Sequence, residues 1–121
     1  MEHFDLLVIG GGPGGYLCAE RAAQGGMSVA LFEAAHMGGT CLNEGCIPTK
    51  TLLKSTTLYR HATESAQFGV TAENVKLDHA AVVKRKAQVV KQLVTGVEST
   101  MKSHKVTVIR ETARIAGRIC R

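Results

Sequence analysis

The sequence predicts an α/β fold built on a parallel sheet, and three observations near the amino terminus carry that prediction. Asp5 to Ile9 (DLLVI) is a short, continuous apolar run that ends in glycine, as a buried parallel strand does. From Gly14 the pattern is helical, and it stops at Gly25-Gly26, a pair typical of a helix end. Ser28 to Phe32 (SVALF) is a second apolar run. Strand, glycine turn, helix and strand within about thirty residues make a βαβ unit, whose crossover is right-handed.

The rest of the chain is expected to add helices and further strands. A loop is predicted over residues 34–40, a helix from Cys41 to about Ala66, and a loop from Phe68 to Asn74. Asp78 can cap a long amphipathic helix, in which apolar residues recur at alternating intervals of four and three: Val83, Ala87, Val90, Val94, Val97 and Met101. Lys105 to Arg110 alternates as a strand does, and Ala113 to Ile119 is expected to begin another.

Length and composition favour one globular domain and argue against several classes of protein. With no Trp and an aromatic content of 4%, the chain is a poor stacking platform for single-stranded nucleic acid. The net charge of +5 is dispersed, and its one basic knot, Lys84-Arg85-Lys86, lies on the expected long helix, where a solvated face accounts for it. The sequence has neither a basic signal region nor an apolar run long enough for a bilayer. We therefore expect a cytoplasmic or organelle-matrix protein that binds neither nucleic acid nor membrane.

The glycines that follow the first expected strand form a dinucleotide-binding pattern. Gly10, Gly12 and Gly15 have G-x-G-x-x-G spacing between a strand and a helix, and this Rossmann-like context strengthens a pattern that is weak alone. Gly10 permits the tight turn, Gly12 the approach of a pyrophosphate, and Gly15 close packing of helix on strand. Glu33 directly follows the second strand, where it can accept both ribose hydroxyls and disfavours a 2′-phosphate. A glycine-rich turn beside a surface glutamate is the alternative, and the pattern alone does not separate FAD from NAD.

Among the four cysteines, Cys41 and Cys46 form the one local pair. A regular helix would turn their side chains to different faces, so a bridge requires a distorted turn, for which Gly45 and Pro48 are the candidates. So short a closed loop adds little stability, which favours a redox role over a structural one, and a helix start would lower the thiol pKa. Two free buried thiols are an alternative. No metal site is expected, because no second cysteine pair or nearby histidine pair supplies further ligands.

The segments VIGGGPGGY and GGTCLNEGCIPTK together resemble the amino-terminal part of the class I pyridine nucleotide–disulfide oxidoreductase family. The resemblance runs along essentially the whole chain, and the C-x4-C-x-P-x-K block is its most specific part. Within the family, CLNEGCIPTK resembles the dihydrolipoamide dehydrogenase branch more than the glutathione branch, whose block is typically CVNVGCVPKK-like.

This resemblance implies a flavoprotein and a role for each matching residue. The FAD pyrophosphate would lie at Gly10, Gly12 and Gly15, and the adenosine ribose at Glu33. Cys41 matches the thiol that exchanges with substrate, and Cys46 the thiol that lies against the flavin. The remaining matches are cofactor contacts: Gly39 and Thr40 at the phosphates, Lys50 near the reactive flavin nitrogen, and Ala113 near the adenine. For Lys50 the alternative is a solvated helix lysine.

The implied reaction is oxidation of protein-bound dihydrolipoamide through a Cys41–Cys46 disulfide and FAD to NAD+. The implied partners are lipoyl domains of 2-oxo acid dehydrogenase or glycine cleavage complexes, and a second subunit in a homodimer. Family members are several times longer, with an NAD-binding domain and a dimerisation domain that carries a His–Glu base.

Residues 1–121 are therefore expected to be the amino-terminal part of the FAD-binding domain, an incomplete Rossmann-like unit that lacks the other two domains. Taken alone, the chain is expected to be inactive. The alternatives are a related reductase acting on mercuric ion or a low-molecular-weight disulfide, and a catalytically inert FAD-binding fragment.

Overall fold

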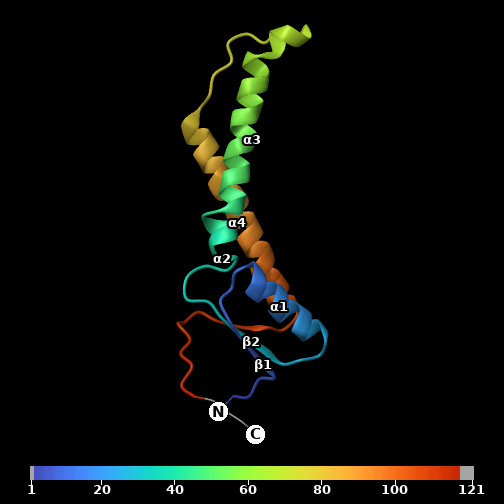
Figure 1. Ribbon diagram of the computed structural model, residues 1–121, viewed down its shortest axis with the longest axis vertical. Coiled ribbons are helices and arrows are strands. Elements are labelled where there is room, and N and C mark those ends of the chain that lie inside the picture. The colour runs from blue at the N-terminus through green and yellow to red at the C-terminus, as the bar shows by residue number, and fades with distance from the viewer. Residues whose placement is uncertain (1, 118–121) are drawn as a thin grey trace.

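The described part of the chain, residues 2–117 of a computed structural model, folds into a parallel sheet with helices packed beside it (Figure 1). The chain order of its elements is β1 (Leu6–Ile9), α1 (Pro13–Gln24), β2 (Val29–Phe32), α2 (Gly39–Asn43), α3 (Cys46–Thr63), the 3₁₀ turn η1 (Ser65–Phe68), α4 (His79–Ser103) and β3 (Thr107–Ile109). The described strands lie in the order β1–β2–β3, and both pairings are parallel. The predicted α/β class with a parallel sheet is thus confirmed.

The sheet is built by two crossovers that leave from the carboxyl ends of its strands. The first is the predicted βαβ unit, in which α1 returns the chain so that Leu6 pairs with Val29 and Ile9 with Phe32. The second runs through the helices α2 to α4 and sets β3 against the other side of β2, with Ala30 opposite Thr107. The loops after β1, β2 and β3 consequently meet at one edge of the sheet, which is where ligands bind in open parallel sheets.

The core lies on one face of the sheet, where α1 and the carboxyl-terminal end of α4 cover it (Figure 1). Its fully buried large side chains are Leu31 of β2, Met37 of the loop after β2, and Met101 of α4. Strand β1 shows that the coverage is one-sided: Leu6 and Val8 pack against this core, whereas Leu7 and Ile9 are 58% and 59% exposed.

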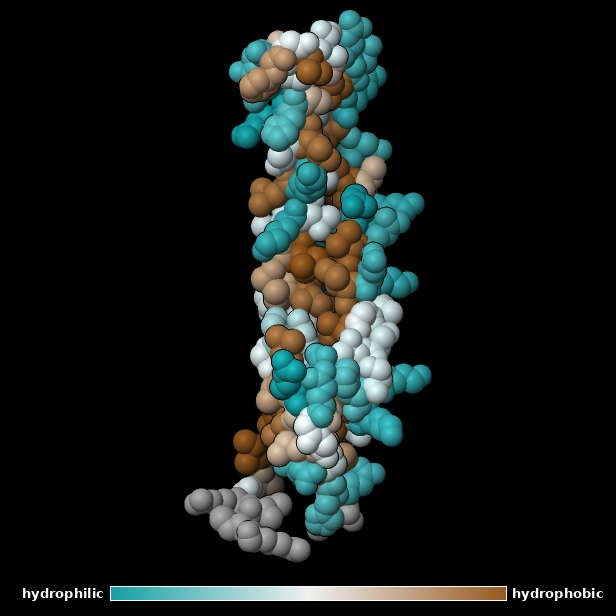
Figure 2. Space-filling model, turned by 90° about the vertical axis from the view of Figure 1, so that its right-hand side faces the viewer, coloured by the Kyte–Doolittle hydropathy of each residue, from teal (hydrophilic) through white to brown (hydrophobic). Residues whose placement is uncertain are grey.

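Helices α3 and α4 pack along one another and project away from the sheet, which gives the molecule its elongated shape (Figure 1). Along the predicted apolar stripe of α4, Met101 is fully buried, Val94 is half-buried and Val83 is 40% exposed. Burial therefore falls with distance from the sheet. Hydrophobic surface remains visible between the two helices (Figure 2).

Most sequence-based expectations for the elements hold, and two are wrong. Asp78 caps α4 as predicted, since its Oδ1 accepts the backbone N–H of Ala81 at 3.0 Å. The helix expected from Cys41 to Ala66 begins two residues earlier, at Gly39, and is interrupted between α2 and α3. The strand expected over 113–119 is absent from residues 113–117, and residues 118 and 119 lie outside the described part.

The reason for the missing strand is that this segment meets the face of the sheet instead of its edge. Residues 112–117 line a pocket together with Leu7, Ile9 and Phe32, whose side chains project from the sheet. On the face of the sheet the backbone groups of this segment lie opposite side chains, so no neighbouring strand is available for a hydrogen-bonded ladder. No helix within residues 2–117 combines the length and apolar character needed to cross a membrane.

Candidate functional site

In the glycine turn after β1, one position, Gly15, is packed too tightly for any larger residue. Gly10 has a φ of +100°, in the region that favours glycine, and ends β1. A Cβ atom on Gly15 would lie 1.7 Å from the carbonyl oxygen of Gly10. Helix α1 therefore rests directly on the end of the strand. Its first intrahelical bond runs from Tyr16 N–H to the carbonyl oxygen of Gly12 at 2.9 Å, so the amides before Tyr16 have no partner within the helix.

Gly11, which lies between the glycines of the G-x-G-x-x-G pattern, also has no room for a side chain. The sequence pattern does not predict a glycine at this position. A Cβ atom there would lie 2.7 Å from Sδ of the buried Met37 and 3.1 Å from Cβ of Glu33. The Gly11 carbonyl accepts the N–H of Gly38 at 2.8 Å. Gly11 thus joins the glycine turn to the loop that follows β2.

Glu33 lies at the carboxyl end of β2, where two backbone donors hold its carboxylate. Oε2 accepts the N–H of Gly11 and Oε1 that of Ala35, both at 2.7 Å. Partial burial acts to raise the pKa of Glu33, but these two hydrogen bonds, with the nearby charges of Arg110 and His36, outweigh it, so the pKa lies below its ordinary value. A carboxylate has about four lone-pair sites, and two are used here, which leaves one on each oxygen for further donors.

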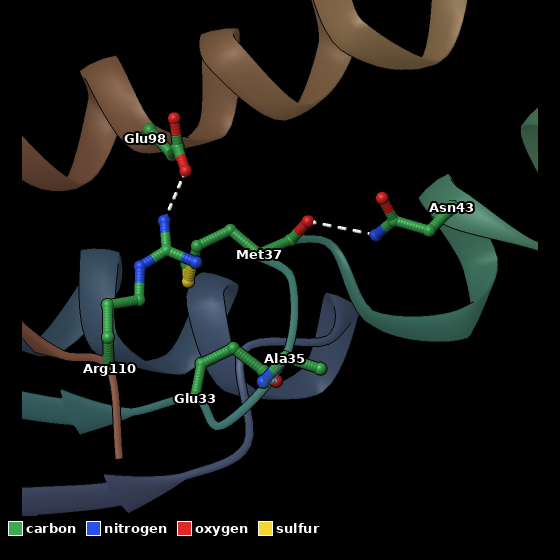
Figure 3. Close-up of polar contacts among 6 residues, drawn as sticks. All are labelled: Glu33, Ala35, Met37, Asn43, Glu98 and Arg110. Atoms are coloured by element: carbon green, nitrogen blue, oxygen red, sulfur yellow. Dashed lines mark hydrogen bonds and ion pairs between the residues drawn. The ribbon is translucent and has the colours of Figure 1, made fainter. Parts of the chain in front are cut away.

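The loop after β2 folds against the glycine turn and is fixed by Asn43. Gly39 approaches Gly12 so closely that a Cβ on Gly39 would lie 2.8 Å from the Gly12 Cα. The Asn43 side-chain amide donates to the Met37 carbonyl at 3.0 Å (Figure 3) and to the Gly39 carbonyl at 2.9 Å. Asn43 stands inside the cysteine motif, but its role depends on carbonyl positions that spacing does not reveal.

Three of the predicted cofactor residues share one pocket. A cavity of about 260 Å³ is lined by Glu33, Gly39 and Thr40, together with Asn43 and flanking loop residues. With Gly12 adjacent to Gly39, the structure brings the glycine turn, the loop after β2 and the acid of β2 to one place. The absence of a Cβ atom at Gly39 lets its backbone lie against Gly12, and the amides of α1 before Tyr16 have no partner within the helix, so these residues fit a dinucleotide whose phosphates accept hydrogen bonds at a helix start.

The two cysteines of the motif lie on either side of the break between α2 and α3. The Thr40 carbonyl accepts the N–H groups of both Glu44 (2.9 Å) and Gly45 (2.6 Å), which ends α2, and Cys46 begins α3. The distorted turn therefore includes Gly45, as predicted. Pro48 has no part in it: it is buried in the first turn of α3, where an N–H is not needed, so that expectation is wrong.

Both Cys41 and Cys46 are free thiols in the structure, Cys41 half-buried and Cys46 exposed. A hydrogen bond from the Cys41 thiol to Cys46, helped by desolvation, raises the pKa of Cys41, although the Cys46 backbone N–H and the Lys50 ammonium act in the opposite direction. The expected lowering of the thiol pKa is thus wrong for Cys41, because the neighbouring thiol stabilises its protonated form. The same interactions place Lys50, exposed one turn into α3, near the cysteine pair.

Two further residues are placed by the strand β3. Ala113 is half-buried beyond its end and lines the pocket of about 550 Å³ on the sheet face with Leu7 and Ile9, apart from the pocket that contains Glu33. Arg110 directly follows β3, pairs with Glu98 of α4, and contributes to the low pKa of Glu33 (Figure 3). The sequence analysis missed Arg110; its one signal is its position at the carboxyl end of a parallel strand.

With this geometry in place, sequence comparison defines the class of protein. The chain belongs to the pyridine nucleotide-disulphide oxidoreductase family, whose profile matches residues 4–118. Within that family it is similar to the dihydrolipoyl dehydrogenase of Zymomonas mobilis, with 43% identity over 96% of this chain and 25% of that protein. It is also similar to those of Geobacillus stearothermophilus (47% identity, 90% of this chain, 23% of that protein) and Bacillus subtilis (49%, 90% and 23%). The chain spans about a quarter of the length of these relatives.

Proposed function

We propose that this chain is the FAD-binding, dithiol-bearing part of a dihydrolipoyl dehydrogenase, which oxidises protein-bound dihydrolipoamide and passes the electrons to NAD+. The observation that carries the proposal is the placement of two free thiols on either side of one helix break, with Cys41 in α2 and Cys46 at the start of α3. The segment that leads from β2 to this pair packs, at Gly39, against Gly12 of a glycine turn that fits a dinucleotide. A dinucleotide turn and a dithiol so close together suit electron transfer between thiols and a flavin.

The residues that would hold FAD are those gathered at the carboxyl edge of the sheet. Gly10, Gly12 and Gly15 would receive the pyrophosphate at the amino terminus of α1, and Glu33 would accept the adenosine ribose hydroxyls with its two remaining lone pairs. We assign the other contacts as the motif suggests: Gly39 and Thr40 to the phosphates, Lys50 to the flavin, and Ala113 to the adenine. When bound, FAD supplies a two-electron acceptor that can return the pair as a hydride to NAD+.

The chemistry of this chain's own residues is a thiol–disulfide exchange, starting from the oxidised Cys41–Cys46 pair. One thiolate of the dihydrolipoyl group attacks the Cys41 sulfur, forming a mixed disulfide and releasing Cys46 as a thiolate. The second dihydrolipoyl thiol, once deprotonated, displaces Cys41, so that the substrate leaves as a disulfide and both cysteines are reduced. The exposed side chain of Cys46 is compatible with a flavin placed against it.

We assign residues 1–121 to the amino-terminal part of the FAD-binding domain, with NAD binding and dimerisation supplied by the rest of a longer parent protein. The partners would then be lipoyl domains of 2-oxo acid dehydrogenase or glycine cleavage complexes, and a second identical subunit. On this assignment the chain alone does not turn over dihydrolipoamide, because nothing in residues 1–121 matches the second glycine fingerprint or the His–Glu base.

The test uses the full-length parent with its flavin bound. Cys41→Ser and Cys46→Ser are each expected to abolish the reduction of NAD+ by dihydrolipoamide while FAD absorbance is retained, because the cysteines carry electrons and do not anchor the cofactor. Mild reduction of the parent should also produce a long-wavelength absorption band that depends on Cys46.

Cys18→Ser is the matched control, since Cys18 is an exposed thiol on α1 outside the motif, and this variant should keep both turnover and the band. Retained turnover in either motif variant would overturn the proposal. A parent that reduces mercuric ion or a small disulfide, and leaves dihydrolipoamide unreacted, would assign it to another branch of the family.

A further inference from the structure

Helix α4 ends in a turn whose geometry ordinarily calls for glycine, and a lysine stands there. The N–H of Lys105 donates to the Lys102 carbonyl at 3.1 Å, and the N–H of Val106 donates to the Met101 carbonyl at 2.9 Å, which is the hydrogen-bond pattern of a Schellman C-cap. Lys105 takes the left-handed conformation that the motif requires, with a φ of +58°. Glycine adopts this conformation without steric cost, and residues with a Cβ do not.

The helix dipole does not account for this lysine. The last carbonyls of α4 already accept hydrogen bonds from backbone N–H groups, that of Thr100 from His104 at 3.1 Å as well as those of Met101 and Lys102. Lys102 already places a cation in the last turn. An exposed cation near a helix end stabilises by less than the left-handed conformation costs. A residue kept in a strained conformation points to a role for its side chain.

Lys105 is one of the residues that line an open surface pocket of about 450 Å³ between α4 and β3. The other lining residues are Glu98, Lys102, Val106, Val108 and Arg110. Glu98 is paired with Arg110 (Figure 3), whereas neither lysine forms a salt bridge with any residue in 2–117. The pocket therefore has an excess of positive charge, and its volume lies in the range of small-molecule sites.

We propose that this pocket binds a small molecule that carries a phosphate or pyrophosphate group. The ammonium groups of Lys102 and Lys105 are compact donors for phosphate oxygens. Arg110 adds those N–H groups of its guanidinium that the ion pair with Glu98 leaves free. The half-buried Val108 and the buried Val106 give the pocket an apolar wall. This pocket shares no lining residue with the pocket that contains Glu33, and the proposal does not depend on the function proposed above.

The test titrates the purified 121-residue chain with inorganic pyrophosphate at constant ionic strength, because surface charges are screened by salt. Equilibrium dialysis measures the affinity, and urea unfolding measures the stability. Lys105→Gly should raise the unfolding midpoint by relieving the left-handed conformation, and should weaken pyrophosphate binding about ten-fold or more through the loss of one charge-assisted hydrogen bond. Lys102→Gln should weaken binding in the same way.

Lys84→Gln is the control, since it removes one positive charge from the same helix outside the pocket, and it should change neither binding nor stability. If Lys105 had only a structural role, Lys105→Gly would change the stability and leave the affinity for pyrophosphate unchanged. A binding role predicts instead that the substitution raises the stability and lowers the affinity, so the two roles are distinguished. The proposal is overturned if the wild-type chain shows no saturable binding, or if Lys105→Gly binds pyrophosphate with unchanged affinity, as it would if the glycine turn were the binding site. If Lys84→Gln weakened pyrophosphate binding equally, the binding would be explained by non-specific attraction to positive charge, and the proposal would be overturned as well.

Discussion

The glycine turn and the helical hairpin formed by α3 and α4 are held in place by different means. At the turn, the backbone fixes the geometry: Gly15 lies against Gly10, and Gly39 against Gly12, with no space for a side chain. In the hairpin, the packing of side chains holds the helices together, and this packing is uneven along α4: Met101 at the sheet end is fully buried, whereas Val83 near the other end is 40% exposed. A small change in the turn should therefore affect the whole fold, whereas the effect of a change in the hairpin should depend on its distance from the sheet.

The largest effect is expected at Gly15. Gly15→Ala places a methyl group 1.7 Å from the Gly10 carbonyl oxygen, so α1 must move off β1, at a cost of about 3 kcal/mol or more in the free energy of unfolding. Urea denaturation followed by circular dichroism measures it. Gly14→Ala is the matched control, because a Cβ there meets nothing within 4 Å and alanine is the better helix former, so it should stabilise slightly. Equal effects of the two substitutions would show that the turn is not rigid.

A second pair of substitutions tests the gradient along the hairpin. Met101→Ala removes a fully buried side chain and should lower the free energy of unfolding by about 2–5 kcal/mol. Val83→Ala lies on the same stripe of α4 but is 40% exposed, and should cost about 0.5 kcal/mol or less. Urea unfolding of both variants checks the difference. Similar losses would mean that the far end of the hairpin is as well packed as the sheet end.

The sequence predicts the features that depend on neighbouring residues better than those that depend on contacts between distant segments. The strand β1, the helix α1 and the strand β2 were predictable because an apolar run, a glycine turn and a glycine stop all act within a few residues. The roles of Gly11 and Asn43 were not, because each depends on a contact with a residue brought in from elsewhere: Met37 against Gly11, and the Met37 and Gly39 carbonyls at Asn43.

The predicted features that failed did so for the same reason. The segment from residue 113 to 117 was predicted to begin a strand, but it lies over the sheet face, where no backbone partner is available. For Cys41, the helix start suggested a lowered pKa, and the neighbouring Cys46 thiol reverses the direction. Local patterns thus predict elements and turns, whereas partners that are distant in sequence, or set by an unforeseen turn, determine the details of the site.

Glu33 joins the rigid turn to the proposed cofactor site, so its replacement should affect both. In the full-length parent, Glu33→Ala is expected to weaken FAD binding about ten-fold or more, since one charge-assisted hydrogen bond contributes about 1.5–3 kcal/mol. The flavin dissociation constant measures it, and an unchanged constant would contradict the assignment of this residue. Glu64→Ala is a suitable control, because it removes an exposed carboxylate at the carboxyl end of α3 that does not line the pocket containing Glu33.

Glu33 also gives this chain a defined pH dependence. Its pKa is lowered in the folded state, so its contribution to stability is fully present above the ordinary value of 4.5 and is lost as pH falls through the lower folded value. Asp5 acts in the same direction, because hydrogen bonds from Ser28 lower its pKa. The acid loss should be smaller in Glu33→Gln than in the wild-type chain when urea midpoints are compared from pH 7 down to about pH 3. If the urea midpoints of the two proteins fell identically with pH, Glu33 would not contribute to the acid sensitivity.

The smallest effect on the rest of the fold is expected at the amino terminus of α4, the end of that helix that lies away from the sheet (Figure 1). Asp78→Ala removes the acceptor for the Ala81 N–H and should destabilise the start of the helix by about 1 kcal/mol, whereas Asp78→Asn keeps an acceptor and should be nearly neutral. Because Leu77 and Val83 on either side of the cap are 46% and 40% exposed, we expect this loss to appear as local fraying. Amide hydrogen exchange should speed up near residue 81 while exchange in β2 stays unchanged. Faster exchange in β2 would show that the cap supports the whole fold, and that the two regions are not independent.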